Sequence, residues 1–286
     1  MKPFLPLSPM IDLGHMRWTT PPGAGHSQGI YTEYMKNLSK VANDILERVE
    51  VETGKSIQFL RDDKLSVLAT LQMARNGSEF HVLRYKPSND PLDYFVAFQA
   101  GFVLRLFENE KSKRFDFSPA PDAFKQVETL VSSGHSLKPQ DLKVLPEFAK
   151  VVAHWALLNL RSLPIGMRID RWISTEYPEL KELQKAGIAV QQQQNMEVLA
   201  YQLGKLTVPT TLLGANAAYA LFADRLLGLE SYCVPYEAMG LVNHGRELLQ
   251  IWDETPTVAA SDCELVNRWA NASGMTGWFD WIPYCP

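Results

Sequence analysis

The segment from Asp93 to Leu106 constrains the fold of this chain more than any other. Apolar side chains recur every three or four residues from Leu92 onward, and with Gln99 they form one stripe along a helix. The apolar members of this stripe are Leu92, Phe95, Val96, Phe102, Val103 and Leu106. Pro91 stands at a position that helices favour near their start. The pattern predicts one continuous helix over residues 93–107. Phe98 and Phe102 are one turn apart, so we expect both rings on its buried side, against a sheet.

The same segment has the spacing of a zinc-protease helix without its chemistry. In such helices, His-Glu-x-x-His places two imidazoles one turn apart to hold Zn²⁺, and the Glu acts as general base. Here the three positions hold Phe98, Gln99 and Phe102. A phenyl ring cannot donate an electron pair to a metal, and a Gln amide cannot take a proton from bound water at neutral pH. The segment therefore predicts no catalytic residue and no metal at this position.

Composition excludes several classes of protein. The 286 residues can bury a sizeable core, and with 46% hydrophobic and 21% charged residues the chain is neither disordered nor collagen-like. A formal net charge of -4 gives no general attraction to nucleic acids or anionic membranes. No phosphate-cradling loop or dinucleotide fingerprint is present, so we expect no cofactor.

Cysteine spacing and the N-terminal residues indicate a compartment. Cys233, Cys263 and Cys285 are widely spaced and form no Cys-x-x-Cys pair, which favours free thiols in a reducing environment. Three prolines within the first nine residues interrupt the apolar stretch that a signal peptide needs, and no segment approaches the roughly 18 apolar residues of a membrane span. We expect a soluble, cytoplasmic protein without a membrane partner.

Turn signals and periodicity divide the chain into an extended arm over residues 1–28, an α+β subregion over 29–114 and a helical subregion over 115–286, packed together as one body. In the α+β subregion we expect a helix with apolar positions from Leu38 to Val49 and a stop at Thr53-Gly54, and a second helix at Leu65–Ala74. We expect strands at Ile57–Leu60 and Phe80–Tyr85. Beyond residue 114 a loop at 117–121 precedes helices at 122–132, 146–162, 178–205, 214–228, 236–253 and 261–273. The predicted fold class is α+β, predominantly helical.

This order of elements resembles the ImmA/IrrE-type metallopeptidase domain, a small zincin-like fold, over about residues 29–108. The stretch from Phe80 to Pro87 is similar to the edge strand that leads into the active-site helix, and Phe98 to Arg105 stands where the family has His-Glu-x-Gly-His. The stretch from Asn216 to Leu227 resembles the family's downstream helix, and Asn216 occupies the position of its acidic zinc ligand. The resemblance implies a zincin-like subregion that has lost its metal. The apolar stripe alone is equally compatible with an unrelated helical α+β fold.

Two further groups of residues each have two interpretations. Arg168 and Asp170 lie in an apolar segment where unpaired charges are costly, so they form either a structural ion pair or a clamp for an anion or carboxylate. The aromatic tail is either docked on the core or a partner-binding patch, and it comprises Trp278, Phe279, Trp281 and Tyr284. The run Gln191–Gln194 is expected to be a solvated helix face.

Candidate nucleophiles and ligands outside these groups are few. No two of the six histidines share a helix at a spacing of three or four residues, so a relocated metal site needs distant segments: His15, His26, His81, His135, His154 and His244. A structural or surface role is the simpler interpretation of each. Gly-x-Ser-x-Gly is absent, and Cys263 lies between Asp262 and Glu264, whose charges raise the pKa of a thiol.

Two functions follow from these patterns. The first is a catalytically inactive metallopeptidase-like protein that binds or regulates another protein; the resemblance implies bacterial stress, mobile-element or phage-related regulation together with helix-turn-helix repressors. The second is an enzyme whose site lies in the helical half, near Arg168, Asp170, Glu237 or His244. Their spacing selects no reaction, and oligomeric state is left open.

Overall fold

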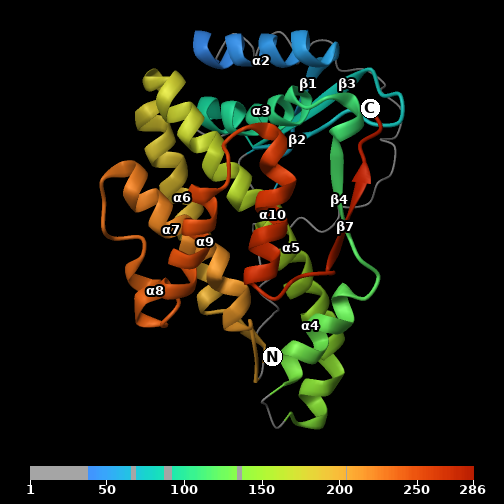
Figure 1. Cartoon of the computed structure of the whole chain (residues 1–286), viewed down its shortest axis with the longest axis vertical. Coiled ribbons are helices and arrows are strands. Elements are labelled where there is room, and N and C mark those ends of the chain that lie inside the picture. The colour runs from blue at the N-terminus through green and yellow to red at the C-terminus, as the bar shows by residue number, and fades with distance from the viewer. Residues whose placement is uncertain (1–37, 66–68, 87–91, 134–136, 204) are drawn as a thin grey trace. The chain divides into compact units, whose positions relative to one another are not determined.

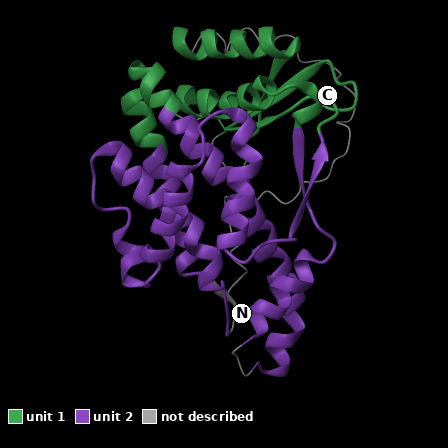
Figure 2. Cartoon of the chain, in the orientation of Figure 1, with its two compact units in different colours: residues 1–114, 172–187, 284–286 green, residues 115–171, 188–283 purple. Residues whose placement is uncertain are grey.

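The computed structural model describes residues 38–65, 69–86, 92–133, 137–203 and 205–286. The arm predicted over residues 1–28 therefore lies outside the described residues, as do His15, His26 and His135. The chain divides into two compact units (Figure 2). The first unit comprises residues 1–114, 172–187 and 284–286, and the second unit comprises residues 115–171 and 188–283.

The first unit combines two long helices with a three-stranded sheet (Figure 1). Its elements are α2 (Lys40–Thr53), β1 (Ser56–Arg61), β2 (Ala69–Gln72), β3 (Phe80–Tyr85), α3 (Leu92–Glu108) and the short helices η2 (Lys111–Lys113) and η3 (Pro178–Leu180). The strand order is β1-β3-β2; β1 runs parallel to β3, and β2 runs antiparallel to it. The two helices pack on each other.

The ends of α2 follow from its sequence. The Ser39 hydroxyl accepts a hydrogen bond from the backbone N–H of Ala42, which satisfies a donor that the helix itself leaves free. Gly54 ends the helix with φ of 67°, a left-handed conformation that glycine adopts without strain. Between these ends, Ile45 and Val49 are buried. The predicted helix at Leu38–Val49 and the predicted strands at Ile57–Leu60 and Phe80–Tyr85 are confirmed.

Two predictions for the first unit are wrong. Residues 69–72 form strand β2 and not part of a helix, because their backbone groups pair with β3, Leu71 opposite Leu83. The strand Phe80–Tyr85 is the central strand of the sheet and not an edge strand, because β1 and β2 pair with its two sides.

The second unit is mostly helical, with two small sheets. Its elements are β4 (Phe115–Pro119), α4 (Ala123–Ser132), most of α5 (Pro139–Glu176) and α6 (Lys181–Leu199), β5 (Gln202–Leu203), β6 (Leu206–Thr207), η4 (Thr210–Leu213), α7 (Gly214–Leu227), α8 (Val234–Ala238), α9 (Val242–Glu254), η5 (Ala259–Ser261), α10 (Asp262–Ala272) and β7 (Phe279–Pro283). The last residues of α5 and the first of α6 belong to the first unit.

The core of the second unit depends on aromatic side chains and one close helix contact. Trp155, Trp252 and Trp269 are each at most 2% exposed. Helices α7 and α9 approach closely at Gly245, where a Cβ would lie 2.9 Å from the backbone carbon of Ala217. Glycine at this position therefore lets the two helices meet.

Several boundaries in the second unit differ from the predicted ones. Residues 115–119 form β4 and not a loop, because they pair antiparallel with β7. Helix α5 continues past residue 162 through Pro164, α6 ends at Leu199, and the predicted helix 236–253 is divided into α8 and α9 at Gly240, with φ of 72°. Gln192 is 1% exposed, so the glutamine run is not a fully solvated face.

The fold class is α+β and predominantly helical, as the sequence predicts. That the two parts pack together as one body stays a prediction. Among the described residues, none of the helices combines the length and apolar character that crossing a membrane requires.

Candidate functional site

The degenerate motif lies on α3, which is continuous from Leu92 to Glu108 and confirms the predicted helix. The Oε1 atom of Gln99 accepts a hydrogen bond of 3.2 Å from the backbone N–H of Leu71 in the edge strand β2. Phe98 is 9% exposed, and its ring centroid lies 5.4 Å from that of Phe102 and 5.8 Å from that of Tyr94. At the motif's three positions the side chains are therefore engaged in packing and in holding the helix to the sheet.

Two contacts join α3 to the sheet. Gln99 bonds to β2, and the Phe107 ring lies 6.3 Å from the His81 ring of β3. Phe98 is buried and Phe102 is half-buried, so neither ring lies in solvent. The two rings contact each other, and the Phe98 ring also contacts Tyr94. That both rings pack against the sheet stays a prediction.

His81 has both ring nitrogens engaged. Its Nδ1 accepts from the backbone N–H of Ala74 at 3.0 Å, and its Nε2 lies 3.1 Å from the Thr53 hydroxyl. That hydroxyl donates to the carbonyl of Val49, so Nε2 carries the proton. Burial, assisted by the charge of Lys55, lowers the pKa of His81 to about 4. The imidazole is therefore neutral near pH 7 and has a structural role.

Arg168 and Asp170 each have partners within the second unit. Arg168 is 3% exposed; it forms an ion pair with Asp262, and it also donates to the backbone carbonyls of Thr255 and Pro256. Asp170 is fully buried, and its Oδ2 accepts from the Tyr219 hydroxyl at 3.2 Å. These partners favour the structural interpretation, because the arginine holds the connection between α9 and α10.

Asn216 is buried in the second unit, on α7. Its Oδ1 accepts a hydrogen bond of 3.1 Å from Asn159 of α5. This amide pair links two helices of the core. Among the described residues, no group of three His, Cys, Asp or Glu side chains is arranged to hold a metal.

The aromatic tail is part of the folded structure. Phe279 and Trp281 lie in β7, where the Phe279 ring stacks on Phe117 of β4 at 4.3 Å. Trp278 and Tyr284 are 3% and 4% exposed. The Tyr284 hydroxyl donates to the carbonyl of Ala74. Of the two interpretations, this geometry favours docking.

The three cysteines are free thiols, as predicted. Burial raises the pKa of Cys263 to about 11, and the neighbouring charge of Asp262 acts in the same direction. A thiol with so high a pKa is almost entirely protonated at neutral pH and makes a poor nucleophile.

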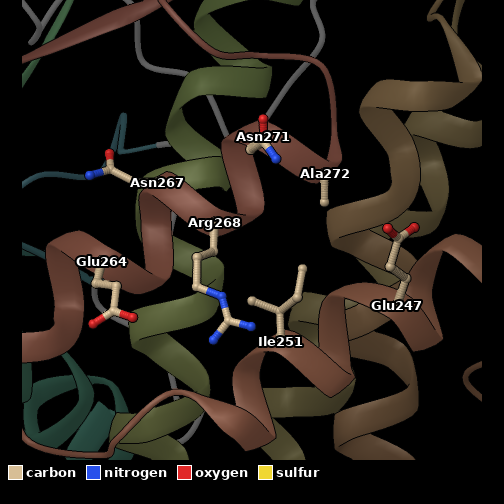
Figure 3. Close-up of a pocket in the computed structure, with 7 residues that line it drawn as sticks. All are labelled: Glu247, Ile251, Glu264, Asn267, Arg268, Asn271 and Ala272. Atoms are coloured by element: carbon tan, nitrogen blue, oxygen red, sulfur yellow. The ribbon is translucent and has the colours of Figure 1, made fainter.

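A groove of about 650 Å³ lies between α9 and α10 of the second unit. Figure 3 shows the Arg268 side chain extending from α10 toward Ile251 of α9. The groove is lined by Glu247, Ile251, Glu264, Asn267, Arg268, Asn271 and Ala272. Arg268 donates to the Thr255 hydroxyl and to Glu254, so its charge is compensated within the unit. The carboxylates of Glu247 and Glu264 then make the groove acidic.

Sequence reasoning missed this groove. Its lining comes from two helices whose contributions are separated along the chain, and no motif links them. The one signal was His244, whose Nδ1 lies 3.3 Å from the Glu247 carboxylate at the rim. Arg168, Asp170 and Glu237, which the sequence suggests for an enzyme site together with His244, do not line the groove.

Comparisons with models of protein families, with curated proteins and with solved structures give no match to this chain. The chemistry of the residues described above therefore provides the basis for a function. The relevant residues belong to the altered motif on α3 and to the groove between α9 and α10.

Proposed function

We propose that this protein is inactive as a metallopeptidase and acts in the cytoplasm as a binding or regulatory module, on a zincin-like first unit that has lost its metal. The observation that carries the proposal is the hydrogen bond from the Leu71 N–H to Gln99. The residue at the position of the general base is thereby engaged in holding α3 to β2.

The chemistry of the neighbouring residues supports the same conclusion. A metallopeptidase needs two imidazoles and a carboxylate directed at one metal ion. Phe98 and Phe102 offer no lone pair, and the imidazole of His81 already uses both nitrogens. Replacing ligands by packed rings favours stability of the unit over metal binding.

The proposed partner is another protein. The resemblance implies a helix-turn-helix repressor of bacterial stress, mobile-element or phage-related genes, and the net charge of -4 gives no reason to expect direct binding to nucleic acid. On the first unit, Val51 and Leu60 are 77% and 44% exposed, and these side chains are available to a partner. Apolar side chains of this kind contribute to the buried centre of protein interfaces.

Metal content tests the loss of the peptidase mechanism. We expect elemental analysis of protein purified without chelators to show far less than one zinc per chain, and we expect no peptide hydrolysis that chelators inhibit. About one zinc per chain would contradict the proposal, because it would mean that ligands come from other side chains.

Co-purification tests the binding role. Gln99→Glu keeps an acceptor for the Leu71 N–H, so we expect the variant to retain its partner, whereas Val51→Asp combined with Leu60→Asp should lose it. Val258, which is 60% exposed on the second unit, provides the matched control as Val258→Asp. Equal recovery of the partner with all three variants would exclude the surface around Val51.

A second candidate function, an enzyme with its site in the helical half, is favoured by one observation. His244 lies beside the acidic groove of the second unit and contacts a carboxylate at its rim.

A further inference from the structure

Three polar side chains of the second unit form two successive contacts that lead from the end of α10 to α9. The Ser273 hydroxyl lies 3.5 Å from Nε2 of His244, and Nδ1 of His244 lies 3.3 Å from Oε2 of Glu247. With the proton of the imidazole on Nδ1, facing the carboxylate, Nε2 is free to accept the proton of the serine hydroxyl. This is the order of nucleophile, base and orienting acid in serine hydrolases. Such distances are often long before substrate binds.

Gly214 fixes the place of the imidazole. A Cβ at this position would lie 1.9 Å from Cδ2 and 2.4 Å from Nε2 of His244, so no other residue leaves room for the ring. Because Gly214 is the first residue of α7, the imidazole lies against the start of that helix. The position of the base is thus set by the backbone of a neighbouring helix.

The same helix end provides a favourable potential for a developing negative charge. Helix α7 has 14 residues, its first turn contains no acidic residue, and its N-cap residue, Leu213, makes no side-chain capping hydrogen bond. The N-terminus of a helix carries a partial positive charge that acts on groups within about one turn. In acyl transfer the oxyanion forms on the carbonyl oxygen of the substrate, and this partial charge favours it when that oxygen lies within one turn of the start of α7.

The groove between α9 and α10 is lined by one of the three residues and by the chain neighbour of another. Glu247 lines it directly, and Ala272, the neighbour of Ser273, lines its other wall (Figure 3). Ser273 is 7% exposed and the His244 side chain is 22% exposed, and this burial favours a small acyl group over a large one. The carboxylates of Glu247 and Glu264 disfavour anionic substrates.

We propose that Ser273, His244 and Glu247 form a hydrolytic site for short-chain carboxylic esters that are neutral or cationic. The Ser273 oxygen attacks the carbonyl carbon while its proton passes to Nε2 of His244. The tetrahedral intermediate collapses by breaking the bond to the alcohol, which leaves with that proton. A water molecule then attacks the acyl-serine, the imidazole takes its proton and returns it to Ser273, and the carboxylic acid departs.

Glu247 is the positioning residue in this sequence. Its carboxylate holds the Nδ1 proton and stabilises the imidazolium that forms during each proton transfer. The site contains no residue of α3. An experiment that contradicts the ester hydrolysis therefore leaves the proposed loss of metallopeptidase activity untouched, and the reverse is also true. Chelators should leave the ester hydrolysis unchanged, because no metal takes part in it.

Covalent labelling of the intact wild-type protein gives the most direct test. We expect a fluorophosphonate probe to modify one site per chain, and peptide mapping by mass spectrometry to place the adduct on Ser273. Prior heating, which unfolds the protein, should abolish labelling. Modification of another residue, or no modification at all, would overturn the assignment without reliance on any variant.

Hydrolysis of p-nitrophenyl acetate and of acetylcholine then tests the individual roles. Ser273→Ala and His244→Gln should each lower kcat/KM by about a hundredfold or more, the size expected for loss of nucleophile or base. Glu247→Gln should lower kcat and shift its pH profile. Ser261→Ala and His154→Gln, remote from the groove, should retain full activity, and circular dichroism checks folding throughout. Unchanged hydrolysis by folded Ser273→Ala would exclude the proposal.

Discussion

The surroundings of His81 keep its imidazole uncharged. The imidazole is buried. In its neutral form, one nitrogen accepts a hydrogen bond from the Ala74 N–H and the other donates to the Thr53 hydroxyl, so both nitrogens have a partner. Protonation would place a second donor opposite the Ala74 N–H and a positive charge near Lys55. The folded protein therefore resists protonation of this side chain.

We expect acid to destabilise the protein through His81. Its pKa of about 4 in the folded state lies below the ordinary value of 6.5, so the unfolded chain binds the proton more readily. The stabilisation is complete above pH 6.5 and falls as the pH decreases from 6.5 to 4, by up to about 3 kcal/mol. Urea unfolding at a series of pH values measures this slope.

Substitution isolates the contribution of this residue. His81→Gln removes the titrating group, so its stability should change less between pH 6.5 and 4 than that of the wild type. His154→Gln serves as the control, because His154 bonds only to the carbonyl of Lys150 among the described residues. Parallel pH curves for the wild type and His81→Gln would contradict the assignment.

Residue types predicted some of these roles and missed others. The absence of ligands at Phe98 and Phe102 follows from the sequence, because no structure gives a phenyl ring a lone pair. The burial of Gln192 does not follow from the sequence, because it depends on which face of α6 packs against the core. The contact of Ser273 with His244 joins residues 29 positions apart, and no local pattern indicates it.

Strand β7 shows how an element can be fixed by a distant partner. Its residues pair with β4 over five positions, from Phe279 opposite Pro119 to Pro283 opposite Phe115. The stacked rings of Phe279 and Phe117 add to the backbone pairing. Alone, either strand would be an unpaired edge with little stability.

Deletion of residues 279–286 should therefore unfold the protein partly or completely. It leaves β4 without a partner and removes Tyr284, whose ring packs 5.8 Å from Phe107. We expect a large fall in melting temperature and the loss of near-ultraviolet circular dichroism.

A milder change separates strand pairing from exposed surface. Ile282→Ser alters a side chain that is 41% exposed and should leave the melting temperature almost unchanged. If the deletion variant instead melts like the wild type, the tail is dispensable for folding and its role as a partner-binding patch regains support.

Elements with strong local periodicity were predicted well, whereas pairing was not. Helices α2, α3, α7 and α10 were placed within a few residues because each has its own apolar stripe and stop signals. The segment at β2 has apolar residues that fit a helix as well as a strand, and pairing with β3 decides between them. The β4–β7 pair joins segments more than 150 residues apart, beyond any local signal.

The first unit is assembled from three separate parts of the chain. Besides residues 1–114, it includes residues 172–187 and 284–286. Tyr94, which is fully buried, lies so close to Gly187 that a Cβ there would be 2.2 Å from its ring. The backbone N–H groups of Asn76 and Gly77 donate to the carbonyls of Cys285 and Pro286.

A fragment of residues 1–114 should consequently not fold on its own. Without the segment around Gly187, the Tyr94 ring loses its cover, and without Tyr284 the Phe107 ring loses a neighbour. We expect weak dispersion in its NMR spectrum and strong binding of a hydrophobic dye. A cooperative melting transition of the isolated fragment would show that the remaining segments are not needed.

The order in which the ribosome makes the chain has a consequence for the first unit. Its sheet and its helices α2 and α3 are translated early, but residues 284–286 emerge only after the second unit has been synthesised. During that interval the Ala74–Gly77 turn lacks its hydrogen-bond partners, and part of the apolar surface of α3 is uncovered. The nascent chain therefore offers a site to chaperones until residues 284–286 are added, and a translation product that stops before them remains in that open state.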